Sequence, residues 1–101
     1  MKIDLMTAFF DRLKTLALRD RDIFFITADH GAWALSEFKK KLKNQYMNIG
    51  ISEQAMASIA AGMALEGKKV FIFSITPFVT QRCLDQIKLD ICLSNLPVTI
   101  V

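Results

Sequence analysis

Residues 48–75, "NIGISEQAMASIAAGMALEGKKVFIFSI", decide the fold because they contain a helix followed directly by a buried strand. Ser52 is a residue type that often precedes a helix, and strong helix formers run from Glu53 to Glu66, until Gly67 ends the helix. The apolar run over residues 68–75 shows no alternation of polar and apolar side chains. Such a run predicts a strand that is buried on both faces of a sheet.

The rest of the chain repeats this alternation of helices and strands. The apolar spacing and the turn residues predict six further elements: helices over residues 5–18, 33–43 and 77–94, and strands over residues 22–29, 45–50 and 96–101. Strands that alternate with helices predict right-handed crossovers and a mainly parallel sheet. We therefore expect an α/β fold with three αβα layers, and 101 residues leave room for one domain at most.

The charge pattern argues against nucleic-acid and membrane partners. Thirteen basic residues face ten acidic ones, and the excess is concentrated in four lysines without interleaved arginines or aromatic residues: Lys39, Lys40, Lys41 and Lys43. We interpret them as a solvated helix face. No apolar run is long enough to span a bilayer, and charges interrupt the N-terminal stretch, so a signal peptide is not predicted either. A cytoplasmic protein is the expectation.

Neither the cysteines nor the histidine predict a metal site. Cys83 and Cys92 are nine residues apart in one predicted helix, a spacing that fits neither a zinc site nor a redox pair. We expect both thiols to be reduced and buried. His30 is the only histidine and lies in a turn, where a structural role and a ligand contact are both open.

Ligands of parallel α/β sheets bind beyond the carboxyl ends of the strands. Three segments should meet there: residues 27–31, 48–53 and 74–78. Glu53 lies in the first turn of its helix, where the helix dipole favours a negative charge, although glutamate is common at helix starts for that reason alone. The residues therefore predict a site at this edge of the sheet that contains Glu53.

The helix that follows Glu53 is rich in small residues, which let another element approach closely. They are Ala55, Ala57, Ala60, Ala61, Gly62 and Ala64. Such a helix can pack tightly in the core or form a contact between subunits, and its composition alone favours the core.

Several motifs taken together resemble a known family. The order "FITADHG", "GISEQ", "AAGMAL" and "PFVTQRCLDQIK" is similar to that of the pyrimidine-binding domain in thiamine-diphosphate enzymes of the transketolase family. The resemblance covers nearly the whole chain and is strongest to the C-terminal half of transketolases that are split into two polypeptides. Deoxyxylulose-phosphate synthase and the β subunit of 2-oxo-acid dehydrogenases are relatives that share the Glu-Gln element.

The resemblance implies roles for individual residues. Glu53 would hydrogen-bond N1′ of the aminopyrimidine ring of thiamine diphosphate and so activate the cofactor for two-carbon ketol transfer between sugar phosphates. Phe78 would stack on that ring. Three residues would complete the cofactor contacts: Asp29, Ile51 and Ile75. Three further residues of the same edge are substrate candidates, although no family role transfers to the first of them: His30, Gln81 and Arg82.

The resemblance also implies that residues 1–101 are the N-terminal part of this domain, which would continue after Val101. A separate diphosphate-binding subunit or domain would hold the diphosphate and Mg²⁺, so this chain supplies no metal ligands and should be inactive by itself. The small-residue helix would then lie at an interface, in a homodimer or a heterotetramer. Three alternatives stay open: a truncated, non-catalytic interaction module, a relative of deoxyxylulose-phosphate synthase, or a relative of the 2-oxo-acid dehydrogenase β subunit that transfers acyl groups to lipoyl.

Overall fold

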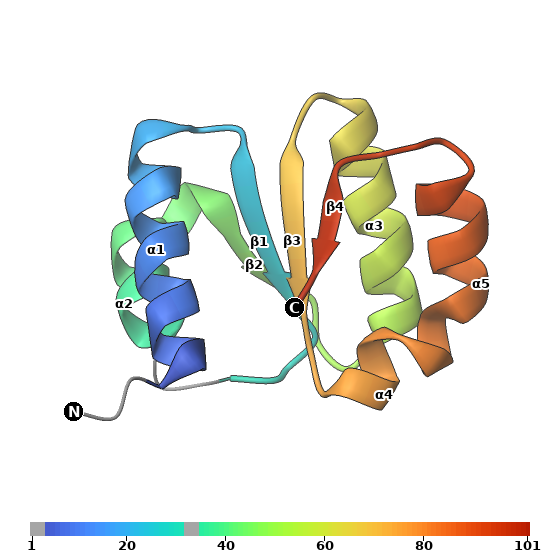
Figure 1. Cartoon of the computed structure of the whole chain (residues 1–101), viewed down its shortest axis with the longest axis horizontal. Helices are drawn as coiled ribbons and strands as arrows, with labels where there is room; N and C mark the ends of the chain where they lie inside the picture. The colour runs from blue at the N-terminus through green and yellow to red at the C-terminus, as the bar shows by residue number, and fades with distance from the viewer. Residues whose placement is uncertain (1–3, 32–34) are drawn as a thin grey trace.

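The computed structural model describes residues 4–31 and 35–101 and contains a four-stranded, fully parallel sheet in the order β2-β1-β3-β4. The strands are β1 (Ile23–Thr27), β2 (Tyr46–Asn48), β3 (Lys69–Phe73) and β4 (Val98–Ile100). The helices are α1 (Leu5–Arg19), α2 (Leu35–Lys41), α3 (Glu53–Leu65), α4 (Thr76–Val79) and α5 (Leu84–Gln86). Helices α1 and α2 cover one face of the sheet and α3 and α5 cover the other (Figure 1). The predicted three-layer αβα fold is confirmed.

Both faces of the central strands are buried, which explains why their sequences do not alternate. On the α1 side, the Phe10 ring packs edge-on against Phe25 and Phe73, with ring centroids 5.3 and 5.4 Å apart. On the opposite side, Ile26 and Ile72 pack against buried small and flexible residues of α3: Met56, Ala60 and Ala64. Small residues on one face of α3, such as Ala60 and Ala64, are buried in the core. On the other face Ala55, Ser58 and Gly62 are exposed.

The predicted helix over residues 77–94 is wrong as a continuous element. The chain instead forms α4, a 3₁₀ turn (Gln81–Cys83), α5 and a π-helical segment (Ile87–Cys92). The break falls at Thr80, whose φ and ψ are −119° and −78° and whose hydroxyl donates to the Thr76 carbonyl oxygen over 2.6 Å. A threonine hydroxyl that bonds the backbone in this way competes with the regular helix pattern.

The helix predicted over residues 33–43 is described from Leu35 to Lys41, and Trp33 lies outside the described residues. Ser52 occupies the position before α3 as predicted, but its hydroxyl does not cap the helix. It lies 3.3 Å from the Ile49 carbonyl oxygen and 3.4 Å from that of Gly50, so it supports the preceding loop instead.

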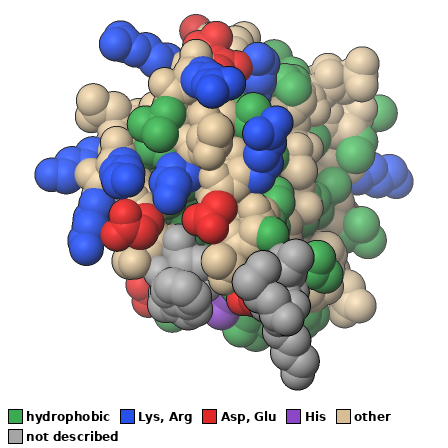
Figure 2. Space-filling view, turned by 60° about the vertical axis from the view of Figure 1, so that its left-hand side comes forward, with side chains coloured by type: hydrophobic (Ala, Val, Ile, Leu, Met, Phe, Trp, Pro, Cys, Tyr) green, Lys and Arg blue, Asp and Glu red, His purple; other side chains and the backbone are tan. Residues whose placement is uncertain are grey.

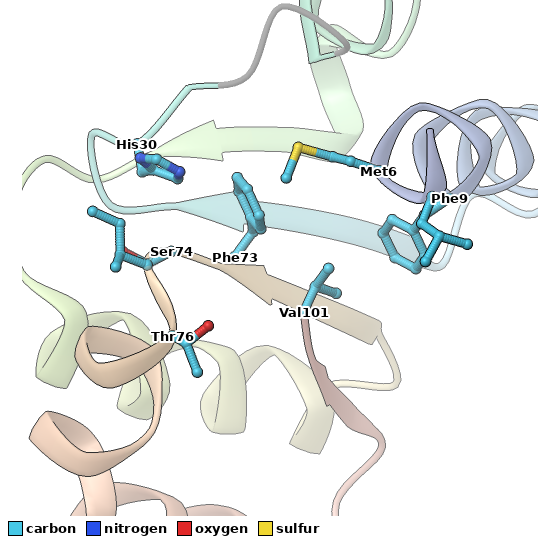
Figure 3. Close-up of a pocket in the computed structure, with 9 residues that line it drawn as sticks. Met6, Phe9, His30, Phe73, Ser74, Thr76 and Val101 are labelled. Carbon is cyan, nitrogen blue, oxygen red and sulfur yellow. The ribbon is translucent and has the colours of Figure 1, made fainter. Parts of the chain in front are cut away.

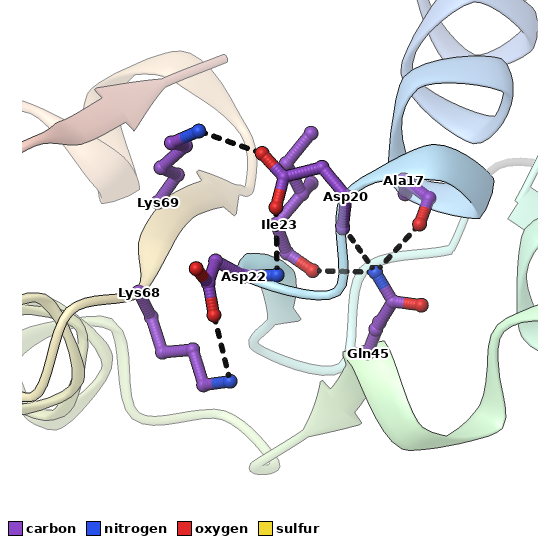
Figure 4. A network of polar contacts seen from close by, with 7 residues as sticks. All are labelled: Ala17, Asp20, Asp22, Ile23, Gln45, Lys68 and Lys69. Carbon is purple, nitrogen blue, oxygen red and sulfur yellow. Dashed lines mark hydrogen bonds and ion pairs between the residues drawn. The ribbon is translucent and has the colours of Figure 1, made fainter.

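The amino ends of the strands are tied together by a polar network, here called the amino-end network (Figure 4). Its centre is Nε2 of Gln45, which lies 2.9 to 3.0 Å from three carbonyl oxygens, those of Ala17, Asp20 and Ile23. Gln45 was predicted to begin a strand, but it ends a 3₁₀ turn (Lys43–Gln45). Its side chain thereby joins the end of α1 to the start of β1.

Two ion pairs complete the amino-end network. Nζ of Lys69 lies 2.6 Å from Oδ2 of Asp20, and Nζ of Lys68 lies 3.5 Å from Oδ1 of Asp22. The hydrogen bond from Lys69 lowers the pKa of the Asp20 carboxyl, and the same bond raises the pKa of Lys69. These contacts join the start of β3 to the turn before β1.

The surface over α1 and α2 carries lysine and arginine side chains that lie among acidic and uncharged ones (Figure 2). The lysine cluster of residues 39–43 is exposed, as a solvated helix face should be. Lys40 and Lys41 lie 3.9 and 4.0 Å from Glu37, and the Lys39 ammonium lies 5.3 Å from the Tyr46 ring centroid. Over residues 4–31 and 35–101, none of the helices has the length and apolar character needed to cross a membrane.

The expectation that both thiols are buried is wrong for one of them. Cys83 is fully buried, and burial raises the pKa of its thiol. Its Sγ donates to the Phe78 carbonyl oxygen over 3.0 Å. Cys92 is exposed at the end of the π-helical segment, because residues nine positions apart point to roughly opposite sides of a helix.

Candidate functional site

The sheet order places a topological switch point between β1 and β3. After β1 the chain passes to β2 at one edge of the sheet, whereas after β3 it passes to β4 at the other edge. The connections therefore diverge at the carboxyl ends of these two strands, in the lower part of Figure 1. Ligand sites of open parallel sheets lie at such divergence points.

Glu53 is the buried charge at this position. It is the first residue of α3 and only 4% exposed. The hydroxyl of Ser74, directly after β3, donates to Oε1 of Glu53 over 3.5 Å. Nη1 of Arg82 lies 3.5 Å from Oε2 of the same carboxylate. Both distances are at the long end for polar contacts, so the buried carboxylate is held loosely and retains capacity to accept hydrogen bonds.

Arg82 also lies against the aromatic ring of the site. Its guanidinium carbon is 3.9 Å from the centroid of the Phe78 ring, within the range of a cation–π contact. The backbone of Arg82 is held by a residue of α3, because Nε2 of Gln54 donates to the Arg82 carbonyl oxygen over 3.1 Å. Phe78 and Arg82 are four residues apart, the spacing of neighbours on one helix face, and lie on either side of the turn at Thr80.

A cavity of about 200 Å³ lies over the Glu53 carboxylate; we call it the Glu53 cavity. Seven of the eight site residues predicted from the sequence line it: Asp29, His30, Ile51, Glu53, Ile75, Phe78 and Arg82. Ile51 and Ile75 are 78% and 45% exposed, which places them at the mouth of the cavity. Gln81 does not line it, and its side chain is exposed to solvent.

Sequence reasoning missed two residues that shape this site. Ser74 is the first polar residue after the apolar strand "VFIF", and this position is the signal that could have identified it. Asn48, at the end of β2, accepts hydrogen bonds from the backbone N–H groups of Asp29 (2.9 Å) and Gly50 (3.0 Å). Both partners have positive φ, 56° and 80°. Asn48 therefore holds in place two left-handed turns beside the cavity, of which the one at Asp29 is strained.

A larger cavity of about 500 Å³ adjoins the first one (Figure 3). The two share His30, Ser74 and Ile75, and the larger one is otherwise lined mostly by apolar residues of α1, β3 and the chain end: Leu5, Met6, Phe9, Phe73 and Val101. The His30 ring packs against Phe73, with centroids 5.1 Å apart. His30 thus lies between the two cavities, in contact with the core and open to either space.

The described residues, 4–31 and 35–101, bring together no group of three or more His, Cys, Asp or Glu side chains that could hold a metal ion. The functional groups of the site are the buried Glu53 carboxylate with the Ser74 hydroxyl, one aromatic face, one guanidinium, a rim of aliphatic side chains, and the side chains of Asp29 and His30. This set can bind a flat, partly polar ring: the aliphatic and aromatic groups bury its faces, and the carboxylate accepts a proton from its edge.

Comparison with known families gives a direct assignment. The family described as "Transketolase, pyrimidine binding domain" matches residues 1–101, the whole chain. The chain belongs to this family. The resemblance drawn from the "GISEQ" and "PFVTQRCLDQIK" motifs is confirmed.

Curated relatives of this transketolase-family chain carry two kinds of name. A subunit of the apulose-4-phosphate transketolase of Phocaeicola vulgatus is 40% identical over 89 residues, covering 87% of this chain and 28% of the relative. The 1-deoxy-D-xylulose-5-phosphate synthase of Clostridium tetani is 38% identical over 92 residues, covering 90% of this chain and 15% of the synthase. The 1-deoxy-D-xylulose-5-phosphate synthase of Synechococcus is 44% identical over 85 residues, covering 82% of this chain and 13% of the synthase.

A solved structure with the same fold is titled "Split gene transketolase, inactive beta4 tetramer". It superposes with a TM-score of 0.88 at 28% sequence identity, covering 98% of this chain and 33% of that one. The chain thus spans a third or less of the length of each of these relatives.

Proposed function

We propose that this chain is the pyrimidine-binding part of a thiamine-diphosphate-dependent transketolase and that Glu53 activates the cofactor. The observation that carries the proposal is the placement of a loosely held, 4% exposed carboxylate at the floor of a cavity with an aromatic side wall. A buried carboxylate in weak contact with its neighbours is costly unless a ligand completes its hydrogen bonds.

The chemistry of the cavity fits the aminopyrimidine half of the cofactor. Glu53 would share a hydrogen-bonded proton with N1′ at the ring edge, Phe78 would stack on the ring, and Ile51 and Ile75 at the mouth would exclude water from its other side. The described part of the chain offers no cluster of side chains for the metal ion that holds a diphosphate. That half of the cofactor is assigned to a partner.

The bound cofactor supplies a nucleophilic carbon and an electron sink for moving a two-carbon ketol unit between sugar phosphates. The contribution of this chain is proton placement: Glu53 would share a proton with N1′ of the ring and so favour the imino form of the ring, whose exocyclic nitrogen can accept a proton. Burial keeps water from competing for that proton, and Ser74 holds Oε1 in orientation. Asp29 and His30 line the cavity entrance, where Arg82 also lies, and are assigned to cofactor or substrate contact.

The relatives support a split enzyme. One is named as a transketolase subunit, and the similar structure is titled as an inactive tetramer of a split-gene product. We infer that this polypeptide needs a diphosphate-binding subunit for activity and that the exposed face of α3, with Ala55 and Gly62, lies in a subunit contact. A homodimer of the pyrimidine subunit within a heterotetramer is the arrangement that we propose.

The test replaces Glu53 by Ala in the natural protein assembled with its diphosphate-binding subunit. We expect two-carbon transfer between sugar phosphates to fall at least about 100-fold, the lower bound for losing a positioned acid or base. The matched control is Glu66→Ala, which removes an exposed carboxylate at the other end of α3. Full activity of Glu53→Ala would mean that the chain is a non-catalytic interaction module.

Deoxyxylulose-phosphate synthase is the second candidate, because relatives with that name are 35 to 44% identical to the chain. Both reactions use the same Glu53 chemistry and differ in the donor. The assembled wild-type protein is therefore given either a ketose phosphate or pyruvate, each with an aldose phosphate acceptor. Carbon dioxide release with pyruvate would assign it to the synthase branch, and transfer from the ketose alone would assign it to the transketolase branch.

A further inference from the structure

The Glu53 cavity already contains a side chain that makes the contacts expected of the cofactor ring. The Arg82 guanidinium carbon lies 3.9 Å from the centroid of the Phe78 ring, and Nη1 lies 3.5 Å from Oε2 of Glu53. These are the two groups that the proposed function assigns to the aminopyrimidine. All three residues line one cavity of about 200 Å³, so the guanidinium and a cofactor ring compete for the same space.

The chemistry of a guanidinium explains why arginine can take this position. The group is planar, stacks on aromatic faces and carries N–H donors along its edge that match a carboxylate. An aminopyrimidine ring has the same three properties: a flat face, N–H groups at its edge and affinity for an aromatic neighbour. Arg82 therefore satisfies both Glu53 and Phe78 with one group, as the ring would. A lysine ammonium in its place would lack the flat face.

The structure also shows how Arg82 can leave. Its backbone is held by the 3.1 Å hydrogen bond from Gln54, and the neighbouring turn is fixed where Cys83 donates to the Phe78 carbonyl oxygen. The side chain, in contrast, is 48% exposed and its contact with Glu53 is long. Release therefore requires rotation of one side chain toward solvent and no movement of a helix.

We propose that Arg82 is a built-in competitor of the cofactor ring, which covers Phe78 and pairs with Glu53 in the free protein and rotates out when thiamine diphosphate binds. The inference rests on the proposed function, because it needs Glu53 and Phe78 to be the ring contacts. While the cofactor is absent, Arg82 prevents the buried carboxylate from remaining an unpaired charge. The apparent affinity for the cofactor is lowered in proportion to the fraction of molecules in which Arg82 has left the site.

The test measures cofactor binding, not turnover. The natural protein, assembled with its diphosphate-binding subunit and freed of cofactor, is titrated with thiamine diphosphate and Mg²⁺ by calorimetry in the absence of sugar phosphates. We expect Arg82→Met to bind about tenfold more tightly than wild type, the gain if Arg82 occupies the site about nine-tenths of the time. Lys88→Met, which removes an exposed positive charge from the neighbouring π-helical segment, should bind like wild type.

A second readout does not depend on any variant. Crystal structures of the assembled wild-type protein, with and without thiamine diphosphate, should show the Arg82 guanidinium against Phe78 only when the cofactor is absent. An Arg82 that stays on Phe78 in both states overturns the competitor role, even if Arg82→Met fails to fold.

The outcomes separate this inference from the proposed function. If wild type and Lys88→Met bind thiamine diphosphate but Arg82→Met binds equally or more weakly, Arg82 is no competitor and the proposed function stands. If none of the three proteins binds the cofactor, the proposed function fails and the competitor role fails with it.

Discussion

The two ends of one sheet are built in different ways. At the amino ends, Gln45 lies 2.9 to 3.0 Å from three carbonyl oxygens, and Lys69 lies 2.6 Å from Asp20 (Figure 4). At the carboxyl ends, the two polar contacts of the Glu53 carboxylate are both 3.5 Å long, and a cavity lies over them. The short contacts are near the surface, whereas the long ones involve a buried charge.

The difference shows where this fold gains stability and where it keeps capacity to bind. Short hydrogen bonds to backbone carbonyls satisfy groups that are otherwise unpaired at the ends of helices and strands. Long contacts around a buried carboxylate leave its binding capacity available, at some cost in stability. We therefore expect changes at the carboxyl ends to alter function and changes in the amino-end network to alter stability.

The largest effect should come from Glu53→Gln. Transfer activity of the assembled protein should fall at least about 100-fold, because the amide cannot share a proton with the ring. The free energy of unfolding, measured with urea on the cofactor-free protein, should stay within about 0.5 kcal/mol or rise, because a buried charge is replaced by a neutral group of the same shape. A clear loss of stability in Glu53→Gln, absent in Glu66→Gln, would show that the carboxylate is a structural group.

Gln45→Ala should lower stability and leave cofactor binding unchanged, the opposite of Glu53→Gln. It leaves the carbonyl oxygens at the end of α1 and the start of β1 without their donor and should lower the free energy of unfolding by about 1–3 kcal/mol. The dissociation constant of thiamine diphosphate should not change. Asn44→Ala, one position earlier and exposed, is the control for both measurements. Weaker cofactor binding in Gln45→Ala alone would show that the two ends of the sheet are coupled.

Ser74→Ala should have a smaller effect that is confined to binding. The hydroxyl donates to Glu53 over 3.5 Å, so its loss should weaken cofactor binding about two- to fivefold, which corresponds to less than about 1 kcal/mol. Calorimetric titration of the assembled protein measures the change, with the exposed Ser94→Ala as control. A loss as large as that of Glu53→Ala would make Ser74 an essential proton donor.

Lys69→Met should give the smallest effect, a loss in the free energy of unfolding that depends on pH. The lowered pKa of Asp20 means that its pairing stabilises the fold above the ordinary carboxyl pKa of 3.8, and this stabilisation is lost as the pH falls through the lower pKa of the folded state. Urea unfolding at several pH values should therefore show Lys69→Met less stable than wild type at neutral pH. The difference should vanish toward about pH 2, where the carboxyl is protonated in both proteins. A difference that persisted there would point to lost packing of the lysine chain.

Most of the fold could be predicted because the strand sequences are apolar at consecutive positions, which indicates burial on both faces. The apolar runs that contain Phe25 and Ile72 have no polar side, and only a sheet covered on both faces can accept them. The edges of the elements could not be predicted in the same way. The strand expected over residues 45–50 shortens to Tyr46–Asn48, because Gln45 is used by the amino-end network and Gly50 turns with a φ of 80°.

The location of the candidate site and most of its residues could be predicted from the sequence. The contacts between their side chains could not. Parallel topology alone brings Asp29, Glu53 and Ile75 to one end of the sheet. The pairing of Arg82 with Glu53 and Phe78 depends on the conformation of one long, half-exposed side chain, which helix propensity does not reveal.

The amino-end network also bears on the order in which the chain folds. The Gln45 contacts join residues that are 22 to 28 positions apart, whereas the Lys69–Asp20 pair joins residues 49 positions apart. Closing the shorter loops costs less chain entropy, so the unit of α1, β1, α2 and β2 should form before β3 docks beside β1. Loss of the Gln45 side chain should then slow folding, and loss of the Lys69 side chain should speed unfolding.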